Sequence, residues 1–361
     1  RTALAEAEVE YHDYRSTTIH VRFPVARSEI AAVAGASIVI WTTTPWTIPG
    51  NRAIAYGEDI DYVVVELAGT DEAEAERPVT VGDRFVMAES LAGEFASAAG
   101  LPSLHTLAHL KGRELAGTIC RHPLHAHGYE FDVPLLAADF VDVETGSGFV
   151  HIAPGHGADD WDLGVRNGIT VPDTVGPDGA FLDDVPLFAG RRILDDHGKP
   201  GNANKAVIAA LSEAGALLAS RPLVHSYPHS WRSKAPLIFR TTPQWFISME
   251  ANDLRGKALA AIDATRFVPP FGQRRLRGMI ETRPDWCISR QRAWGVPITV
   301  FVNKRTGEPL RDEKILARVI DAVAAEGADA WFASDPARFL APEYDPADFE
   351  QVRDILDVWF D

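Results

Sequence analysis

The segment Trp41-Thr-Thr-Thr-Pro-Trp-Thr47 follows a β-branched stretch, 37–41, that predicts a strand, so the threonines lie where that strand ends. Further along the chain, a second β-rich stretch, Gly148-Phe-Val-His151, leads to Ala158-Asp-Asp160. This second segment brings two histidines and two aspartates close together in sequence. We expect the two segments to form the two walls of one polar pocket, which the rest of the chain supports.

The composition is that of a globular protein with ample core material. The chain has 361 residues, of which 46% are hydrophobic, and this length allows two or three packed units. No apolar run approaches the ~20 residues needed to cross a bilayer, and the first residues lack the pattern of a signal peptide. We expect a cytoplasmic protein without membrane contact. Because the chain begins with Arg1 and stops inside an apolar stretch, 357–361, that predicts a strand, we expect it to be the interior of a longer polypeptide.

The charge is unevenly distributed along the sequence. The formal net charge of -16 taken alone disfavours a nucleic-acid partner, because phosphate binding needs local positive charge. Acidic residues dominate 58–94, which predicts a solvated face. Segment 255–292 is instead rich in arginine and is interleaved with aromatic residues, three inside it and Trp294 just beyond it, which makes a phosphate-backbone contact as good an interpretation as a solvated face. Its basic residues are Arg255, Lys257, Arg266, Arg274, Arg275, Arg277, Arg283, Arg290 and Arg292.

Periodicity and turn residues predict a mixed α/β chain. Short β segments broken by Gly and Pro between 104 and 149 are typical of a barrel-like or sandwich-like β domain. A long loop is expected at 170–200. Further strands are predicted at 18–23, 37–41, 60–67, 237–240 and 245–249. Helices are predicted at 87–99, 158–167, 202–214 and 312–325, the last with an Asp cap and a Gly stop.

Six motifs, in order and over nearly the whole chain, carry a resemblance to a known family. They occupy 41–54, 146–160, 225–232, 242–249, 283–298 and 357–361. Together they resemble isoleucyl-tRNA synthetase, a class I aminoacyl-tRNA synthetase. The related valine and leucine enzymes usually carry Arg at the place of Thr44, which favours the isoleucine enzyme, with the editing region of a valyl- or leucyl-tRNA synthetase as the alternative.

The resemblance implies a β-barrel-like editing domain inserted into a Rossmann-type catalytic domain that is only partly present. It assigns 1–28 to a connector from the catalytic domain and 29–224 to the β-rich editing domain. It assigns 225–344 to a connective region and 345–361 to the start of the second half of the catalytic domain. The family's HIGH-type and KMSKS-type ATP motifs are absent, since Gly155-His-Gly157 is not in a HIGH context. We therefore expect no cofactor for editing, and ATP with Mg²⁺ only in the full-length enzyme, at a site outside this chain.

The resemblance also implies hydrolysis of the ester of valine mischarged onto isoleucine tRNA. Isoleucine against valine is itself the known case in which one methylene gives only modest discrimination, so that a second, hydrolytic site is needed. The expected partners are isoleucine tRNA and an amino acid, bound by a monomer. The residues implied as catalytic are Asp160, as the carboxylate for the substrate ammonium, His151, as a limit on pocket size, Thr43 and Thr44. Those implied as substrate-binding are Thr42, Trp46, Thr47, Asn51, Ala153 and, in the pocket of the synthetic site, Trp359.

Each feature also has a plainer interpretation. The threonines are common at strand ends, His151 suits a core position, and Asp160 suits the first turn of a helix. His151, His156 and Asp160 together raise the alternative of a metal-dependent hydrolase. Cys120 and Cys287 lie far apart and the segment 227–231 lacks Cys, so no zinc site is predicted. A tRNA-binding module with an inactive pocket is a third possibility.

Overall fold

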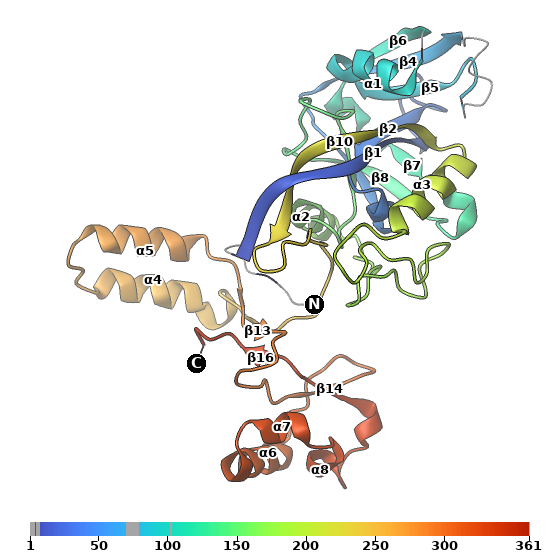
Figure 1. The fold of residues 1–361 in the computed structure, drawn as a ribbon. Coiled ribbons are helices and arrows are strands. Elements are labelled where there is room, and N and C mark those ends of the chain that lie inside the picture. Colours follow the sequence, from blue (N-terminus) through green and yellow to red (C-terminus); the bar gives the residue numbers. More distant parts are fainter. Residues whose placement is uncertain (1–3, 5–7, 70–78, 102, 361) are drawn as a thin grey trace. The chain divides into compact units, whose positions relative to one another are not determined.

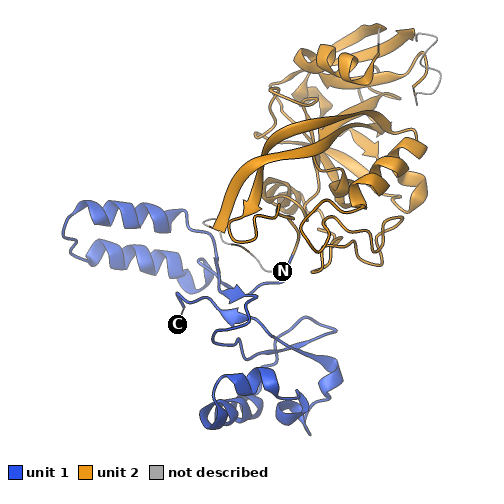
Figure 2. Ribbon diagram, in the orientation of Figure 1, with its two compact units in different colours: residues 1–3, 242–361 blue, residues 4–241 orange. Residues whose placement is uncertain are grey.

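The computed structural model describes residues 4, 8–69, 79–101 and 103–360. Part of the predicted acidic block, 71–76, and Asp361 lie outside these residues. The described chain divides into two compact units, 4–241 and 242–361 (Figure 2). Among the described residues, no helix has the length and apolar character needed to span a membrane.

The first unit is built on one ten-stranded sheet (Figure 1). The order is β6-β4-β5-β2-β1-β7-β8-β3-β9, with β10 paired to β1. The strands are β1 (Val9–Arg27), β2 (Ser37–Thr42), β3 (Ala53–Tyr56), β4 (Asp61–Gly69), β5 (Arg84–Ala88), β6 (Ser103–Lys111), β7 (Ile119–Arg121), β8 (Asp132–Ala137), β9 (Phe149–Ile152) and β10 (Leu217–Ser230). A mixed α/β fold with a β-rich domain is thus confirmed.

The expected barrel does not close. Within the described residues the hydrogen-bonded path has two ends, at β6 and β9. β9 is only four residues long and pairs with β3 alone in this path. β6 is largely exposed, so it serves as an edge strand.

The central strands are buried on both faces. In β2, Ile38 and Ile40 enter one hydrophobic cluster, whereas Val39 enters another on the opposite face. β4 and β5 alternate between the same two clusters in the same way. This double burial explains why 38–40 and 62–65 are continuous apolar runs, because neither face of these stretches meets water.

In its described residues this unit also has the α-helices α1 (Ala92–Ala99), α2 (Ala158–Arg166) and α3 (Ala203–Glu213). The predicted helices at 158–167 and 202–214 are confirmed. The helix predicted at 87–99 starts later, because Met87 and Ala88 pair within the sheet as part of β5, but it ends at Gly100 (φ 63°) as expected. Residues 170–200 form turns and isolated bridges without a helix or strand, as predicted.

β1 and β10 form a long antiparallel ribbon. Val9 pairs with Ser230 at one end and Val21 with Leu217 at the other. The predicted domain boundary at 224/225 falls within β10, and the compact unit ends at residue 241. The assignment of functional domains stays a prediction, because compactness alone does not define them.

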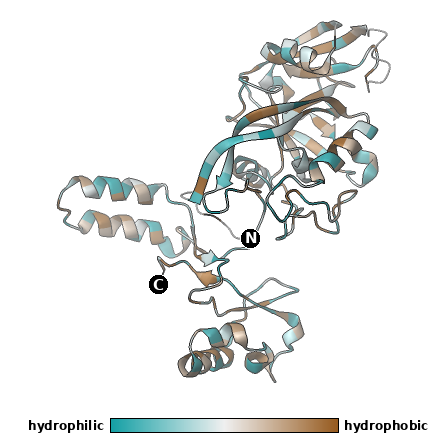
Figure 3. Ribbon diagram, in the orientation of Figure 1, coloured by the Kyte–Doolittle hydropathy of each residue, from teal (hydrophilic) through white to brown (hydrophobic). Residues whose placement is uncertain are grey.

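The second unit, 242–361, contains an antiparallel pair of helices and a small packed core. α4 (Leu254–Ala264) and α5 (Phe271–Glu281) form the pair, and Figure 3 shows hydrophilic and hydrophobic residues mixed along both. Trp331, Phe301 and Phe339 centre the core. The remaining elements are β11 (Phe246–Ile247), β12 (Trp286–Cys287), β13 (Ser289–Arg290), β14 (Phe301–Asn303), α6 (Glu313–Glu326), α7 (Asp329–Ala333), α8 (Ala337–Leu340), β15 (Phe349–Gln351) and β16 (Ile355–Leu356).

After residue 230, the predicted helix cap is confirmed and two predicted strands are wrong. The Asp312 carboxylate accepts the N–H groups of Lys314 and Ile315, which confirms the predicted cap of α6. No strand forms at 237–240. The strand predicted at 357–361 is also wrong in its described part, because 358–360 is a turn. There the Asp357 carboxylate accepts the N–H of Trp359 and pairs with Arg290.

Candidate functional site

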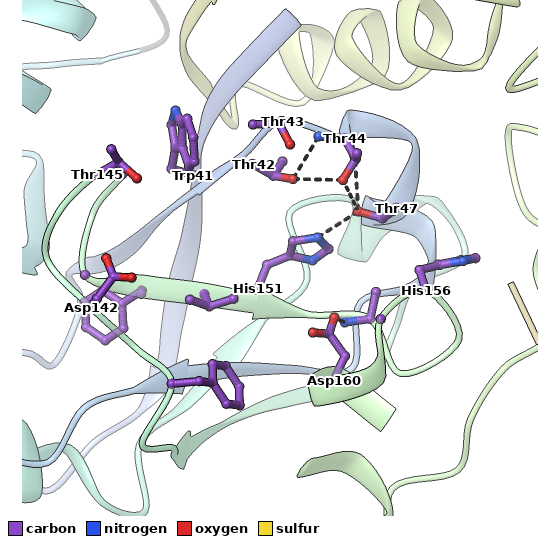
Figure 4. A pocket seen from close by; sticks show the side chains of 17 residues that line it. Trp41, Thr42, Thr43, Thr44, Thr47, Asp142, Thr145, His151, His156 and Asp160 are labelled. Atoms are coloured by element: carbon purple, nitrogen blue, oxygen red, sulfur yellow. Dashed lines mark hydrogen bonds between the residues drawn. The ribbon is translucent and has the colours of Figure 1, made fainter. Parts of the chain in front are cut away.

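The two sequence motifs line one cavity of about 340 Å³ in the first unit (Figure 4). The threonine segment that ends β2 forms one wall, and β9 with the start of α2 forms another. A third part of the lining comes from the loop before β9. The expectation that these distant segments meet in one pocket is therefore met by the geometry.

The threonine segment is held by its own hydroxyl groups. Thr42 Oγ1 accepts the N–H of Thr44 at 3.1 Å and lies 3.3 Å from Thr44 Oγ1. Thr47 Oγ1 donates to the Thr44 carbonyl at 2.9 Å. Pro45 then opens the short 3₁₀ helix Pro45–Gly50, where its missing N–H is not needed. Thr43 differs, because its hydroxyl has no hydrogen bond to any described residue although it lines the cavity.

His151 is fixed by a directed chain of hydrogen bonds. Asn51 Nδ2 donates to the Ala53 carbonyl at 2.9 Å and to His151 Nδ1 at 3.3 Å, which makes Nδ1 an acceptor. We therefore assign the ring proton to Nε2, which donates to Thr47 Oγ1 at 2.8 Å. Thr47 Oγ1 can accept it because its own proton goes to the Thr44 carbonyl. Burial lowers the pKa of His151 to about 3, so the ring is neutral at physiological pH.

Asp160 lies in the first turn of α2 and lines the cavity. Its Oδ2 accepts the N–H of Ala153 at 2.8 Å. Gly157 leaves room for it, since a Cβ there would lie 3.0 Å from the carboxylate carbon. Burial raises the pKa of Asp160 to about 6, against the opposing effect of the Ala153 N–H. At neutral pH the group is mostly ionised, and a bound cation would stabilise that charge.

His156 also borders the cavity, but both of its ring nitrogens serve the chain. Nδ1 lies 2.9 Å from the Phe239 carbonyl, and Nε2 lies 2.7 Å from Thr174 Oγ1. His151 and His156 therefore direct their nitrogens at separate partners and do not converge with Asp160. Among the described residues, no group of three His, Cys, Asp or Glu side chains could hold a metal ion. The geometry gives the metal-dependent alternative no support.

Seven of the ten predicted site residues line the cavity: Thr42, Thr43, Thr44, Thr47, His151, Ala153 and Asp160. Trp46 does not; it is buried, its ring packs against His156, and its backbone N–H donates to the Asn204 side-chain oxygen. Asn51 is fully buried behind His151. Trp359 belongs to the other unit and is 87% exposed. The roles assigned to all ten stay predictions.

The sequence prediction did not assign site roles to several residues that line the cavity. They are Trp41, Phe140, Asp142, Thr145, Gly146, Gly148, Phe149, Val150, Gly157 and, outside the metal-dependent alternative, His156. Gly146 and Gly148 have φ angles of 91° and 75°, which only glycine adopts readily, and they fold the 140–145 loop back beside β9. The paired glycines of Gly146-Ser-Gly148 were the available signal for that turn. Asp142 adds a second carboxylate to the lining.

Comparison with known proteins places this arrangement in a family. Residues 1–361 match the family model described as tRNA synthetases class I (I, L, M and V). The chain belongs to the class I tRNA synthetases. The family prediction made from the six motifs is thereby confirmed.

Curated relatives of this synthetase chain carry the name isoleucine–tRNA ligase. The protein from Gluconobacter oxydans is 50% identical over 375 residues, and that from Pelagibacter ubique is 46% identical over 361 residues. Each alignment covers 100% of the chain but only 38% of the relative. Among solved structures, a leucyl-tRNA synthetase editing domain from P. falciparum gives a TM-score of 0.33 at 10% identity, covering 42% of this chain and 67% of that one. So distant a likeness supports nothing further.

Proposed function

We propose that the chain carries the editing site of an isoleucine–tRNA ligase, which hydrolyses the ester of valine mischarged onto isoleucine tRNA. The observation that carries the proposal is one cavity with an ionisable carboxylate, a rigid neutral imidazole and an unengaged hydroxyl. The names of the relatives support the choice of amino acid. In this proposal 29–224 is the editing domain, inserted into a Rossmann-type catalytic domain of a longer protein.

Asp160 binds the α-ammonium group of the substrate. A free carboxylate oxygen remains beside the cavity after Oδ2 has accepted the Ala153 N–H. An ammonium group there forms a charge-assisted hydrogen bond and lowers the pKa of the carboxyl group from its raised value. Asp160 is thus both the anchor and the group whose ionisation controls binding.

His151 sets the size limit for the side chain. Its Nδ1 accepts from Asn51 and its Nε2 donates to Thr47, so neither nitrogen is available to take a proton from water. A ring held at both nitrogens cannot rotate to admit a larger side chain without breaking these bonds. We therefore assign His151 a steric role and no role as a general base.

Thr43 is the hydroxyl that contacts the reacting ester. Water adds to the ester carbonyl, the carbon–oxygen bond to the ribose breaks, and the products are free valine and tRNA with its terminal hydroxyl restored. The Thr43 hydroxyl, which has no partner among the described residues, can donate to the carbonyl oxygen as negative charge develops on it. Thr42, Thr44 and Thr47 hold the loop that presents it.

The longer protein attaches isoleucine to its tRNA with ATP. Its partners in this proposal are isoleucine tRNA and the amino acid, and it acts as a cytoplasmic monomer. ATP with Mg²⁺ binds outside this chain, and editing uses no cofactor.

The test is the rate at which the purified chain removes valine or isoleucine from isoleucine tRNA. We expect selective loss of valine, and the Asp160→Ala variant is the control for contaminating hydrolases. Equal rates for the two amino acids would contradict an isoleucine-specific editing site. No hydrolysis of either by the chain or by the full-length protein would contradict the proposal as a whole.

A further inference from the structure

The α4–α5 hairpin has more charge and apolar surface than its own packing uses. Ile262 is its one buried side chain, and none of its residues belongs to the four hydrophobic clusters of the described chain. Phe271 and Met279 are 62% and 55% exposed. The hairpin therefore presents a surface that no described residue covers.

Two of its arginines hold the two helices together. Arg255 donates to the carbonyls of Ile280 and Glu281, at 2.7 and 3.2 Å, and pairs with Glu250. Arg277 pairs with Asp263 at 2.6 Å and with Glu281 at 3.1 Å. These guanidinium groups are committed to the fold and are not available to a ligand.

Four other arginines are uncommitted. The side chains of Arg266, Arg274, Arg275 and Arg283 are exposed and make no hydrogen bond or ion pair with any described residue. The count of nine basic residues in 255–292 thus separates into groups that stabilise the fold and groups that face solvent.

The geometry of α5 gathers this free charge on its outer face. Gln273, Arg277 and Ile280 form the inner face, since Gln273 donates to the Ile262 carbonyl and Arg277 reaches Asp263. At 3.6 residues per turn, Phe271, Arg275 and Gly278 lie together on the opposite face, flanked by Arg274 and Met279. We call residues 271, 274, 275, 278 and 279 the outer face of α5.

Gly278 has no internal reason to be glycine. A Cβ at this position would meet nothing within 4 Å, and glycine inside a helix costs about 1 kcal/mol relative to alanine. The missing side chain leaves the helix backbone open beside Arg274 and Arg275. That gap allows a partner's backbone to approach the helix closely between two positive charges.

We infer that the outer face of α5 binds the phosphate backbone of RNA, through Arg274 and Arg275 on either side of the Gly278 gap. Identifying the RNA as tRNA rests on the proposed function. Charge complementarity favours this partner. The chain as a whole has a net charge of -16 and repels a polyanion such as RNA, so RNA can bind only where unpaired cations are clustered locally. Phe271 on the same face can stack on an unpaired base or pack on a ribose.

The experiment measures binding of uncharged isoleucine tRNA by the chain as a function of salt. The variant is Arg274→Ala/Arg275→Ala. The matched control is Arg305→Ala/Arg311→Ala, which removes the same charge from two exposed arginines of the same unit whose side chains have no partner among the described residues. We expect about tenfold weaker binding near 0.1 M salt for the α5 pair, and a salt slope lower by about two. The control pair should match the parent.

A second variant protects the test against misfolding. Gly278→Glu raises helix propensity while it fills the gap and adds a negative charge, so binding should weaken while the helix is retained in circular dichroism. Unchanged affinity in both α5 variants, or an equal loss in the control pair, would overturn the inference. Hydrolysis of mischarged tRNA is scored separately, so a chain that binds tRNA through Arg274 and Arg275 but never hydrolyses it contradicts only the proposed function.

Discussion

In the cavity of the first unit, the side chains of Thr42, Thr44, Thr47 and His151 are joined by hydrogen bonds, whereas on the outer face of α5 the guanidinium groups have no partner among the described residues. Asn51, His151 and Thr47 form a chain in which each donor has its acceptor. Arg274 and Arg275 face solvent alone. The contrast teaches that the cavity has a shape before any ligand arrives, which suits discrimination by size. The outer face of α5 offers exposed positive charges that no side chain of the protein fixes in place, which suits a contact with the phosphate backbone that does not depend on the RNA sequence.

The largest expected effect removes the carboxylate that we assign to the substrate ammonium, Asp160. In Asp160→Ala, hydrolysis of valyl-tRNA should fall about a hundredfold, because the substrate ammonium loses a charge-assisted hydrogen bond. Single-turnover deacylation measures the loss. Turnover equal to that of the parent would show that shape alone suffices.

The second-largest effect is expected from removing the side chain that limits the size of the pocket, His151. His151→Ala should make isoleucyl-tRNA a substrate. We expect the parent to hydrolyse valyl-tRNA about ten to two hundred times faster than isoleucyl-tRNA, and this ratio of rates should fall toward one in the variant. The rates for the two charged tRNAs are compared in the same variant. Continued rejection of isoleucine would place the size limit elsewhere in the lining.

A third effect concerns pH. With a pKa of about 6, Asp160 ionises as pH rises through that value, and only the ionised form binds ammonium. kcat/KM for valyl-tRNA should therefore fall about tenfold per pH unit below 6 and level off above 7. His151, with a pKa near 3, does not titrate in this range. If kcat/KM still fell at low pH in Asp160→Asn, the fall would be due to another titrating group.

The smallest effect is on stability. The pKa of Asp160 is raised from 3.8 to about 6 in the folded chain, so ionisation favours the unfolded state as pH rises through this interval. Asp160→Asn keeps an acceptor for the Ala153 N–H and should gain about 1–3 kcal/mol relative to the parent between pH 4 and 7.5. Denaturant unfolding at both pH values measures this gain. A difference that is independent of pH would contradict the burial of a charged carboxylate.

Much of the cavity was predictable because its residues lie in two short motifs. A β-branched run followed by four threonines predicts a strand that ends in a polar loop, and β2 ends at Thr42. The sequence could not tell which hydroxyl would stay free. That depends on Pro45 turning the chain so that Thr47 Oγ1 reaches the Thr44 carbonyl and leaves Thr43 unengaged. Similarly, only the fold places Asn51 behind His151.

The helices of the hairpin were not predicted. Gly256, Gly272 and Gly278 lower helix propensity, and Pro269-Pro270 interrupts the stretch between the two segments, so residue preferences alone do not favour helices here. The contacts of Arg255 and Arg277 compensate by holding α4 and α5 together. Such contacts are tertiary. The sequence shows how many arginines there are, but it does not show which of them hold the two helices together.

The β1–β10 ribbon has a consequence for how this unit could be acquired or lost. Val9 lies opposite Ser230, so the two strands that flank most of the unit are neighbours, and neighbouring strands are about 5 Å apart in a sheet. A tight turn joining those two strands would delete everything between them. The same entry point would accept a different folded module in its place. The ribbon thus makes the segment between its two strands a separable part of the chain.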